Sequence, residues 1–316
     1  MAKESFSHQP VLLEEVLKGL NINRDGIYID GTFGRGGHAS ELLKALGPKG
    51  RLMVMDKDPE AISAAQQMFV NDERAADERV VIAQGSFAML KQLVSEQGWL
   101  GKVDGLLLDL GVSSPQLDDA DRGFSFRHDG ALDMRMDPDS GGSAAQWLAR
   151  VSEIELARVL YEYGEERFSR RIARAIVDAR TERPITSTKQ LAQIVADANP
   201  KWEKGKNPAT RSFQAIRIEI NNELKDLQVY LSQVTDVLKP GGRIAVISFH
   251  SLEDRIVKRF IRDQSKGDRY PAGLPVTEAQ LDPKLKPVGK ALYPSEQELQ
   301  RNPRARSSVL RVAEMR

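Results

Sequence analysis

The sequence of 316 residues contains no cysteine. This absence excludes disulfide bonds, zinc sites with cysteine ligands, iron–sulfur clusters and a cysteine nucleophile. The sequence also lacks an apolar run that approaches 18 residues, and residues 1–5 carry no pattern of a signal peptide. We therefore expect a cytoplasmic protein that makes no use of a membrane.

The sequence also has no excess of one charge sign, because it contains 46 lysines and arginines and 45 aspartates and glutamates. The charges are nevertheless unevenly distributed. Residues 255–316 hold 14 basic and 7 acidic side chains, whereas residues 118–139 hold 7 acidic and 3 basic ones. A basic C-terminal section suits a phosphate-rich partner, although a solvated charged face would look the same.

Glycines are concentrated directly after a short apolar run that ends in Asp30. They are Gly31, Gly34, Gly36 and Gly37. Glycines between a strand and a helix let the backbone approach a nucleotide-like ligand more closely than a Cβ atom would allow. A tight turn that needs glycine only for its geometry is the alternative interpretation.

A second acid, Asp56, closes the next apolar run at a distance typical of a carboxylate that binds ribose hydroxyls. The glycine spacing differs from the dinucleotide fingerprint, which directs a helix N-terminus at a pyrophosphate. Asp30 would repel a pyrophosphate but could lie beside the ammonium group of a methionyl moiety. The two acids and the glycines therefore favour S-adenosylmethionine over a nicotinamide dinucleotide.

Short apolar runs alternate with segments of helical pattern. The expected strands are residues 27–30, 52–55, 80–83, 103–109 and 243–249, with a last strand at residues 307–312. Strands that alternate with helices predict an α/β fold with a parallel sheet, whose ligands bind at the carboxyl ends of the strands. Asp30, Asp56 and Asp109 all fall at such ends.

More than 130 residues separate Asp109 from the strand at residue 243, far more than a crossover requires. Apolar residues from Phe213 to Leu238 recur every three or four positions and predict one continuous helix. The remainder predicts an inserted small helical domain, residues 118–208, for substrate recognition. Residues 1–117 and 209–316 would form the main, Rossmann-like domain.

The residues after the fourth strand suit methyl transfer to an exocyclic amine. Such an amine is a poor nucleophile, so its N–H bonds must be held by acceptors that orient its lone pair. An acid followed by a turn of carbonyls that ends in proline supplies acceptors, which makes Asp109, Ser113 and Pro115 the catalytic candidates. The alternative is that Asp109 caps the turn and Pro115 only shapes it. Methylation of cytosine at C5 is excluded, because it requires a cysteine thiolate.

Several longer stretches resemble the MraW (RsmH) family of 16S ribosomal RNA cytosine-N4 methyltransferases. They are residues 30–38, 109–118, 122–126, 132–137, 249–255 and 302–308. The resemblance implies a class I S-adenosylmethionine-dependent methyltransferase sheet with an inserted helical domain. It also implies methylation of a cytidine in the decoding region of the small (30S) ribosomal subunit, and a homodimer.

The resemblance further implies which residues bind the cofactor S-adenosylmethionine. They are Gly36, Gly37, His38, Asp56, Phe87, Asp109 and Gln116. Two of them have alternatives, because His38 could cap a helix and Phe87 could belong to the core. No metal is expected, since transfer from a sulfonium requires positioning rather than a Lewis acid.

Candidates for RNA binding lie mainly at two basic places in the sequence. They are Arg301, Arg304 and Arg306 near the C-terminus, with Lys201, Lys204, Lys206 and Arg211 where the insertion ends. His250, at the end of a predicted strand, could hydrogen-bond the base, although a structural histidine is the more common case. A non-catalytic RNA-binding assembly factor that retains a methyltransferase fold is the alternative function, and a dehydrogenase is a third.

Overall fold

The computed structural model describes residues 10–70, 77–201, 207–268 and 277–316. The chain divides into two compact units. The first consists of residues 1–111 and 225–316, and the second of residues 112–224. The expected domain boundaries at residues 118 and 208 both lie inside this second unit.

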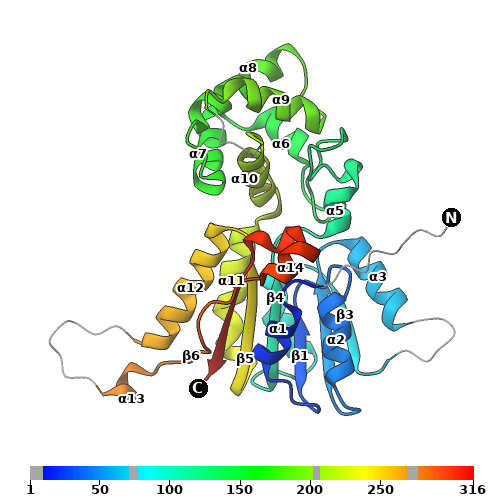
Figure 1. Cartoon of the computed structure of the whole chain (residues 1–316), viewed down its shortest axis with the longest axis vertical. Coiled ribbons are helices and arrows are strands. Elements are labelled where there is room, and N and C mark those ends of the chain that lie inside the picture. Colours follow the sequence, from blue (N-terminus) through cyan, green and yellow to red (C-terminus); the bar gives the residue numbers. More distant parts are fainter. Residues whose placement is uncertain (1–9, 71–76, 202–206, 269–276) are drawn as a thin grey trace. The chain divides into compact units, whose positions relative to one another are not determined.

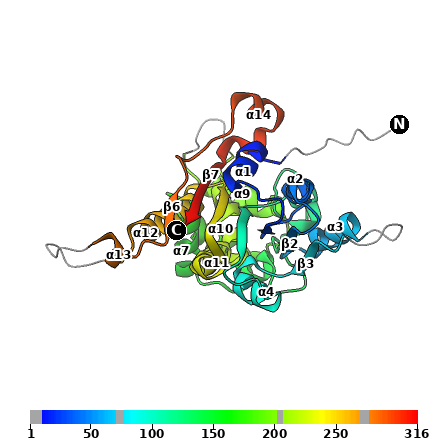
Figure 2. The same ribbon diagram turned by 90° about the horizontal axis from the view of Figure 1, so that it is seen from below.

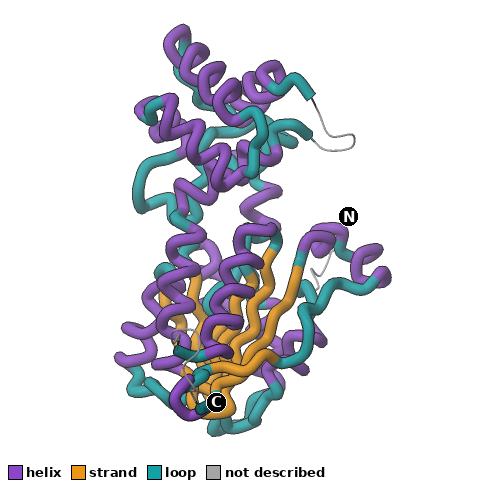
Figure 3. The backbone as a smooth tube through the Cα atoms, turned by 90° about the vertical axis from the view of Figure 1, so that its left-hand side faces the viewer, coloured by secondary structure: helices purple, strands orange, loops and turns teal. Residues whose placement is uncertain are grey.

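The first unit is built on one seven-stranded sheet (Figures 1 and 3). Its strands are β1 (Ile27–Asp30), β2 (Arg51–Asp56), β3 (Val80–Gln84), β4 (Val103–Asp109), β5 (Leu238–Ser248), β6 (Leu285–Pro287) and β7 (Val309–Met315). The order is β3-β2-β1-β4-β5-β7-β6, and β7 is antiparallel to both of its neighbours. This order with a reversed β7 is that of class I S-adenosylmethionine-dependent methyltransferases, so the expected fold class is confirmed.

Helices cover both faces of the sheet (Figure 2). The helices of the first unit are α1 (Leu13–Leu20), α2 (Gly37–Ala45), α3 (Pro59–Phe69), η1 (Phe87–Met89), α4 (Leu90–Glu96), α11 (Glu223–Val237), α12 (Ser251–Lys266), α13 (Glu278–Leu281), α14 (Glu296–Arg301) and η3 (Pro303–Ser307). Successive strand residues point to opposite faces. Ile29 accordingly packs with α4, α11 and α12, whereas Tyr28 packs with α1, α2 and α3.

The described residues of the second unit form helices, turns and loops, with one isolated antiparallel bridge between Ala131 and Ser187. Its helices are α5 (Ser114–Asp118), η2 (Ala120–Arg122), α6 (Ala144–Arg150), α7 (Glu153–Gly164), α8 (Ser169–Glu182), α9 (Thr188–Ala198) and α10 (Thr210–Asn221). Its own hydrophobic core includes Leu160, Ile176 and Leu191. The expected helical insertion is therefore present.

The prediction of one continuous helix from Phe213 to Leu238 is wrong. The chain breaks at Asn222, whose φ of 53° is left-handed and ends α10 before α11 begins. An asparagine tolerates this conformation at a helix C-terminus, and the apolar spacing runs through the break unaltered. Phe213 and Ile216 of α10 pack in the core of the second unit, whereas Leu227 and Leu231 of α11 pack in the first.

Strand β5 begins at Leu238, five residues before the expected start, and pairs with β4 through an irregular register at Val103. The segment from residue 267 to 303 contains α13, β6 and α14 in its described part. In the described part of the chain, no helix combines the length and apolarity required to cross a bilayer.

Candidate active site

Three acids meet at the carboxyl ends of neighbouring strands in the first unit. Asp30 ends β1, Asp56 ends β2 and Asp109 ends β4. Strand β1 lies between the other two and is parallel to both, so all three carboxyl ends lie at one edge of the sheet. The sequence prediction that these acids share one edge is confirmed.

Asp56 is held by the backbone on both of its oxygens. Oδ2 accepts the N–H of Gly34 at 2.8 Å, and Oδ1 accepts the N–H of Asp58 at 2.9 Å. Burial raises the pKa of Asp56 to about 6, although these two hydrogen bonds oppose the rise. Each carboxylate oxygen has two lone pairs, so the fixed carboxylate retains acceptor capacity for hydroxyl groups.

Asp30 is almost completely buried, with 1% of its surface exposed. Its Oδ1 accepts the N–H of Thr32 at 3.1 Å. Burial and the nearby charge of Asp56 raise the pKa of Asp30 to about 7, while the bond from Thr32 opposes the rise. A carboxyl group buried this deeply is costly in its ionised form unless a cation lies beside it.

Asp109 is the least satisfied of the three acids. Its backbone N–H donates to the hydroxyl of Thr32 at 2.6 Å, but its buried Oδ1 has no hydrogen-bond partner within the described structure. Burial raises the pKa of Asp109 well above its ordinary value, and the charges of Asp30 and Glu253 raise it further. Asp56 repels Asp30, and Asp30 repels Asp109, so a positively charged ligand would stabilise this site.

The glycine loop joins β1 to α2 and is fixed by strand carbonyls. Gly31 donates to the carbonyl of Leu107 at 2.9 Å. Gly36 is the N-cap of α2 with a φ of 77°, and a Cβ atom there would lie 2.6 Å from the ring of Phe33. The geometry of this turn therefore already requires glycine at position 36, and contact of Gly36 and Gly37 with a cofactor stays a prediction.

His38 is buried, and its ring is bonded within the protein. Nε2 lies 3.0 Å from the carbonyl oxygen of Val11, which fixes Nε2 as the protonated nitrogen. Nδ1 lies 3.6 Å from Oδ2 of Asp109. Burial lowers the pKa of His38 to about 4, so the imidazole is neutral at pH 7. The ring anchors the segment before α1, and a cofactor contact of His38 stays a prediction.

Phe87 packs edge to face against Tyr230 of α11, with ring centroids 5.7 Å apart. The ring is only partly buried, and its Cβ lies 3.4 Å from the position of a Cβ on Gly31. Phe87 thus belongs to the core on one side and lies beside the end of β1. Stacking of Phe87 on an adenine ring stays a prediction.

Helix α11 brings further polar groups to this edge of the sheet. Asp226 accepts hydrogen bonds from Lys57 Nζ at 2.9 Å and from Ser86 Oγ at 2.6 Å. These partners directly follow β2 and β3, and Lys57 follows the predicted ribose acid. The sequence gives no local signal for Asp226, because it lies 169 positions from Lys57.

The comparisons with known proteins agree with this geometry. The family model described as the MraW methylase family matches residues 5–316. Ribosomal RNA small subunit methyltransferase H of Thioalkalivibrio sulfidiphilus is 58% identical over 313 residues, covering 99% of this chain and 98% of that protein.

The chain belongs to the MraW methylase family.

Among solved structures, a putative rRNA-methylase from Clostridium thermocellum matches with a TM-score of 0.47 and 11% identity, covering 98% of this chain and 100% of that one. An rRNA methylase from Streptococcus thermophilus matches with a TM-score of 0.42 and 11% identity, over 96% and 92% of the two chains.

In this MraW methylase, the sheet edge that carries Asp30, Asp56 and Asp109 suits S-adenosylmethionine, the cofactor of methylases with this fold. The molecule carries a sulfonium and an ammonium group, and the site offers the carboxyl groups of Asp30 and Asp109. The vicinal hydroxyls of its ribose suit the carboxylate of Asp56, which the backbone holds in one orientation. The donor and acceptor chemistry therefore fits this cofactor.

His250 has a structural role at the start of α12. Its Nδ1 accepts the N–H of Glu253 at 3.4 Å, while the Glu253 carboxylate accepts the backbone N–H of His250 at 3.3 Å and that of Phe249 at 2.7 Å. His250 and Glu253 thus form a reciprocal capping box. Base contact by His250 stays a prediction. The spacing of His250 and Glu253 could have indicated the cap from sequence.

Ser113, Pro115 and Gln116 belong to the second unit of this methylase. Ser113 is the N-cap of α5, and its N–H donates to Oε1 of Gln116 at 2.9 Å, which completes another capping box. Pro115 occupies the first turn of α5, where a backbone N–H would have no partner within the helix, so its absence costs nothing. The serine and glutamine three positions apart are a signal for this cap that the sequence analysis missed. Their catalytic and cofactor roles stay predictions.

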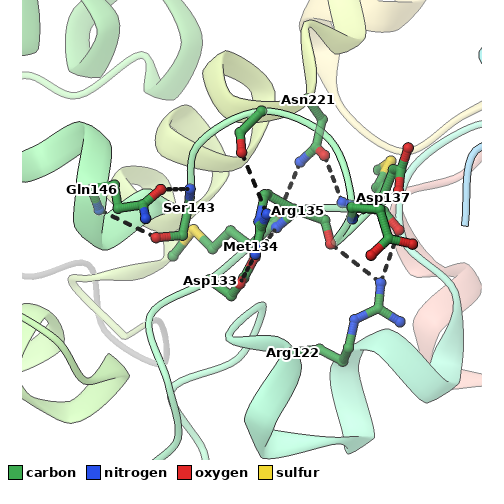
Figure 4. Close-up of polar contacts among 11 residues, drawn as sticks. Arg122, Asp133, Met134, Arg135, Asp137, Ser143, Gln146 and Asn221 are labelled. Carbon is green, nitrogen blue, oxygen red and sulfur yellow. Dashed lines mark hydrogen bonds and ion pairs between the residues drawn. The ribbon is translucent and has the colours of Figure 1, made fainter.

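The motif at residues 132–137 forms a fixed loop in the second unit (Figure 4). The Asn221 side chain donates to the carbonyl of Met134 at 2.7 Å and accepts the N–H of Met136 at 2.7 Å. Met134 is fully buried with a left-handed φ of 63°, and the guanidinium of Arg135 binds both oxygens of Asp133. The motif is thus explained by packing and local hydrogen bonds.

The basic candidates for RNA binding are partly described. Arg301 ends α14, and Arg304 and Arg306 follow in η3, all three exposed on the first unit. Exposed Lys201 and Arg211 lie in the second unit, where Arg211 donates to the carbonyl of Glu165 at 3.3 Å. Lys204 and Lys206 fall outside the described residues. RNA contact stays a prediction for all of them.

Proposed function

We propose that this chain transfers a methyl group from S-adenosylmethionine to N4 of a cytidine in the decoding region of 16S ribosomal RNA. The observation that carries the proposal is the unpartnered Oδ1 of Asp109 in a cluster of acids at the end of β4. The 58% identity to a small-subunit ribosomal RNA methyltransferase supports this acceptor. The reaction would take place in the cytoplasm, on RNA of the small (30S) subunit.

The residues that would hold the cofactor follow from the chemistry of the edge. Asp56 would accept the ribose hydroxyls, and Asp30 would lie beside the cationic methionyl end. Backbone N–H groups of the glycine loop and the ring of Phe87 would complete the site. The bound cofactor would supply an electrophilic methyl group.

Asp109 is proposed as the catalytic residue. Its free Oδ1 would accept an N–H of the cytosine amine and so direct the nitrogen lone pair at the methyl group. A carboxyl group with a raised pKa is also the stronger base. Asp109 would therefore take the proton that the amine gives up as the new N–C bond forms.

The test is transfer of labelled methyl to small subunits that lack this modification, followed by mass spectrometry of the nucleosides. We expect N4-methylated cytidine with the native protein, and at least a 100-fold loss with Asp109→Asn, since general acid–base groups contribute about 10²–10⁴-fold. Asp236→Asn is the matched control, because Asp236 forms an ion pair with Lys91 in which both side chains are about half exposed. Near-native turnover by Asp109→Asn would refute the role of Asp109.

The same assay separates the alternative of a non-catalytic assembly factor. Tight binding of the cofactor and of small subunits, with no label in any RNA, would favour the assembly factor. A homodimer is also part of the proposal and rests on the family resemblance, and sedimentation of the native protein would measure it.

A further inference from the structure

Charge is segregated along the inserted helical unit. Residues 112–166 contain 12 acidic and 5 basic side chains, whereas residues 167–217 contain 12 basic and 4 acidic ones. The unit as a whole is close to neutral, so its total charge conceals this division. The basic half begins at the turn before α8.

Helix α8 has one buried apolar face and one exposed face that carries arginines. Ile172, Ala173 and Ile176 are completely buried in the core of the unit, where α8 packs against α7 and α9 (Figure 1). Arg170, Arg171 and Arg174 are exposed on the other side of the helix. We define the arginine face as these three residues together with the exposed Arg167, which precedes the helix.

The arginine face lacks the partners that neutralise other arginines of the unit. Within the described part of the chain, the side chains of Arg170 and Arg171 make no hydrogen bond or ion pair, and Arg174 only approaches Asp178 at 3.9 Å with both side chains about three-quarters exposed. The first turn of α8 contains no acidic residue. By contrast, Arg180 of the same helix donates to the carbonyl of Leu148.

The spacing of the arginines on this face suits the successive phosphates of a nucleic acid strand. Arg170 and Arg174 are one turn apart, which is roughly 6 Å along the helix axis, comparable to the spacing of successive phosphates in a nucleic acid strand. Arg167 is held near the helix start, with its guanidinium 5.6 Å from the ring centre of Phe168. All four groups are arginines, whose planar fork matches phosphate oxygens better than a lysine does.

We propose that the arginine face of Arg167, Arg170, Arg171 and Arg174 docks the phosphate backbone of the substrate RNA. This proposal rests on the proposed function and adds to it a surface that fixes how the RNA is held, independent of base sequence. The surface would contribute to binding of the small subunit and leave the reacting groups unaltered.

The experiment uses the full-length protein with Arg170, Arg171 and Arg174 all replaced by Gln. The matched control removes the same charge from the same unit by Arg127→Gln, Arg150→Gln and Arg183→Gln, all at exposed positions. Steady-state methylation of unmodified small subunits gives KM and kcat over a range of salt concentrations. Binding of S-adenosylmethionine, measured separately, shows that the first unit remains intact.

We expect the arginine-face variant to raise KM for small subunits at least tenfold with kcat within about twofold of native. The slope of log KM against log salt should fall by about 2–3, since each phosphate contact contributes about 0.7–0.9. The control triple should keep the native KM and slope. Equal KM values and slopes in the two triples would refute the arginine face.

Two other outcomes are informative. If the native protein methylates no RNA, the proposed function fails, and anisotropy with a labelled 16S fragment then tests the arginine face alone through the same two triples. If the arginine-face variant binds small subunits normally but loses binding of polyglutamate, the surface recognises an acidic protein and the RNA proposal is overturned.

Discussion

Binding of the cationic cofactor should depend on pH through Asp30. The carboxyl group is 1% exposed, and burial raises its pKa to about 7. At a pKa of about 7, the ionised fraction is roughly a tenth at pH 6 and nine tenths at pH 8. If the ionised form is the one that binds the cation, Kd for S-adenosylmethionine should fall about tenfold over this interval.

Asp30→Asn should remove this dependence. The amide keeps an oxygen that can accept the N–H of Thr32, so the turn is preserved while the charge is lost. Calorimetric titration at pH 6, 7 and 8 measures Kd for the native protein, for Asp30→Asn and for the control Asp236→Asn. A Kd for the native protein that is constant across this range, or an equal slope in Asp30→Asn, would refute the reasoning.

The same raised pKa also affects the stability of the cofactor-free protein. A rise in pH strengthens cofactor binding but lowers the free energy of unfolding. The folded state holds the Asp30 proton more tightly than the unfolded state, whose aspartate has the ordinary pKa of 3.8. The resulting stability is present below pH 3.8 and is lost as the pH rises to about 7. At pH 8, the free energy of unfolding of Asp30→Asn should therefore be about 1–3 kcal/mol higher than that of the native protein. Denaturant titration measures this difference.

Three more changes test individual contacts. Asn221→Ala should lower the free energy of unfolding by about 2–3 kcal/mol, because it leaves the backbone of the buried Met134 loop unpaired, and denaturant titration would show no change if that loop were held otherwise. Gly36→Ala should cost about 1–3 kcal/mol, since its left-handed φ and the Phe33 ring leave no room for a Cβ atom, and a native melting temperature would contradict this. Tyr230→Phe should keep or slightly raise stability, by up to about 1 kcal/mol, since the buried hydroxyl has no partner among described residues, and a large loss in thermal unfolding would reveal one.

The sequence predicted the features of the site that local patterns encode. Asp30, Asp56 and Asp109 could be placed together because parallel strands carry their carboxyl ends to one edge. Asp226 and Tyr230 could not, because they reach this edge only after the chain has passed through the whole inserted unit. No spacing rule connects residues across such an interval.

The sequence was least informative where the fold depends on one backbone conformation. Apolar spacing through Asn222 is the same in one helix as in two, so only the left-handed φ of this residue reveals the break. The capping box at Ser113 shows the converse case, in which a recognisable pattern was present and a catalytic interpretation was preferred. At His250 a structural histidine was the favoured interpretation, and the structure gives it the role of a helix cap. His38 hydrogen-bonds the carbonyl of Val11, and no sequence motif predicts this contact.

The edge strand β6 affects how copies of this protein behave at high concentration. An exposed strand edge can pair with the edge of another molecule and start aggregation. β6 is only three residues long, ends in Pro287 and carries Lys286, whose Nζ lies 2.7 Å from Glu314. A proline cannot donate the next ladder hydrogen bond, and a charged side chain opposes association. This end of the sheet is thereby protected against growth by added strands.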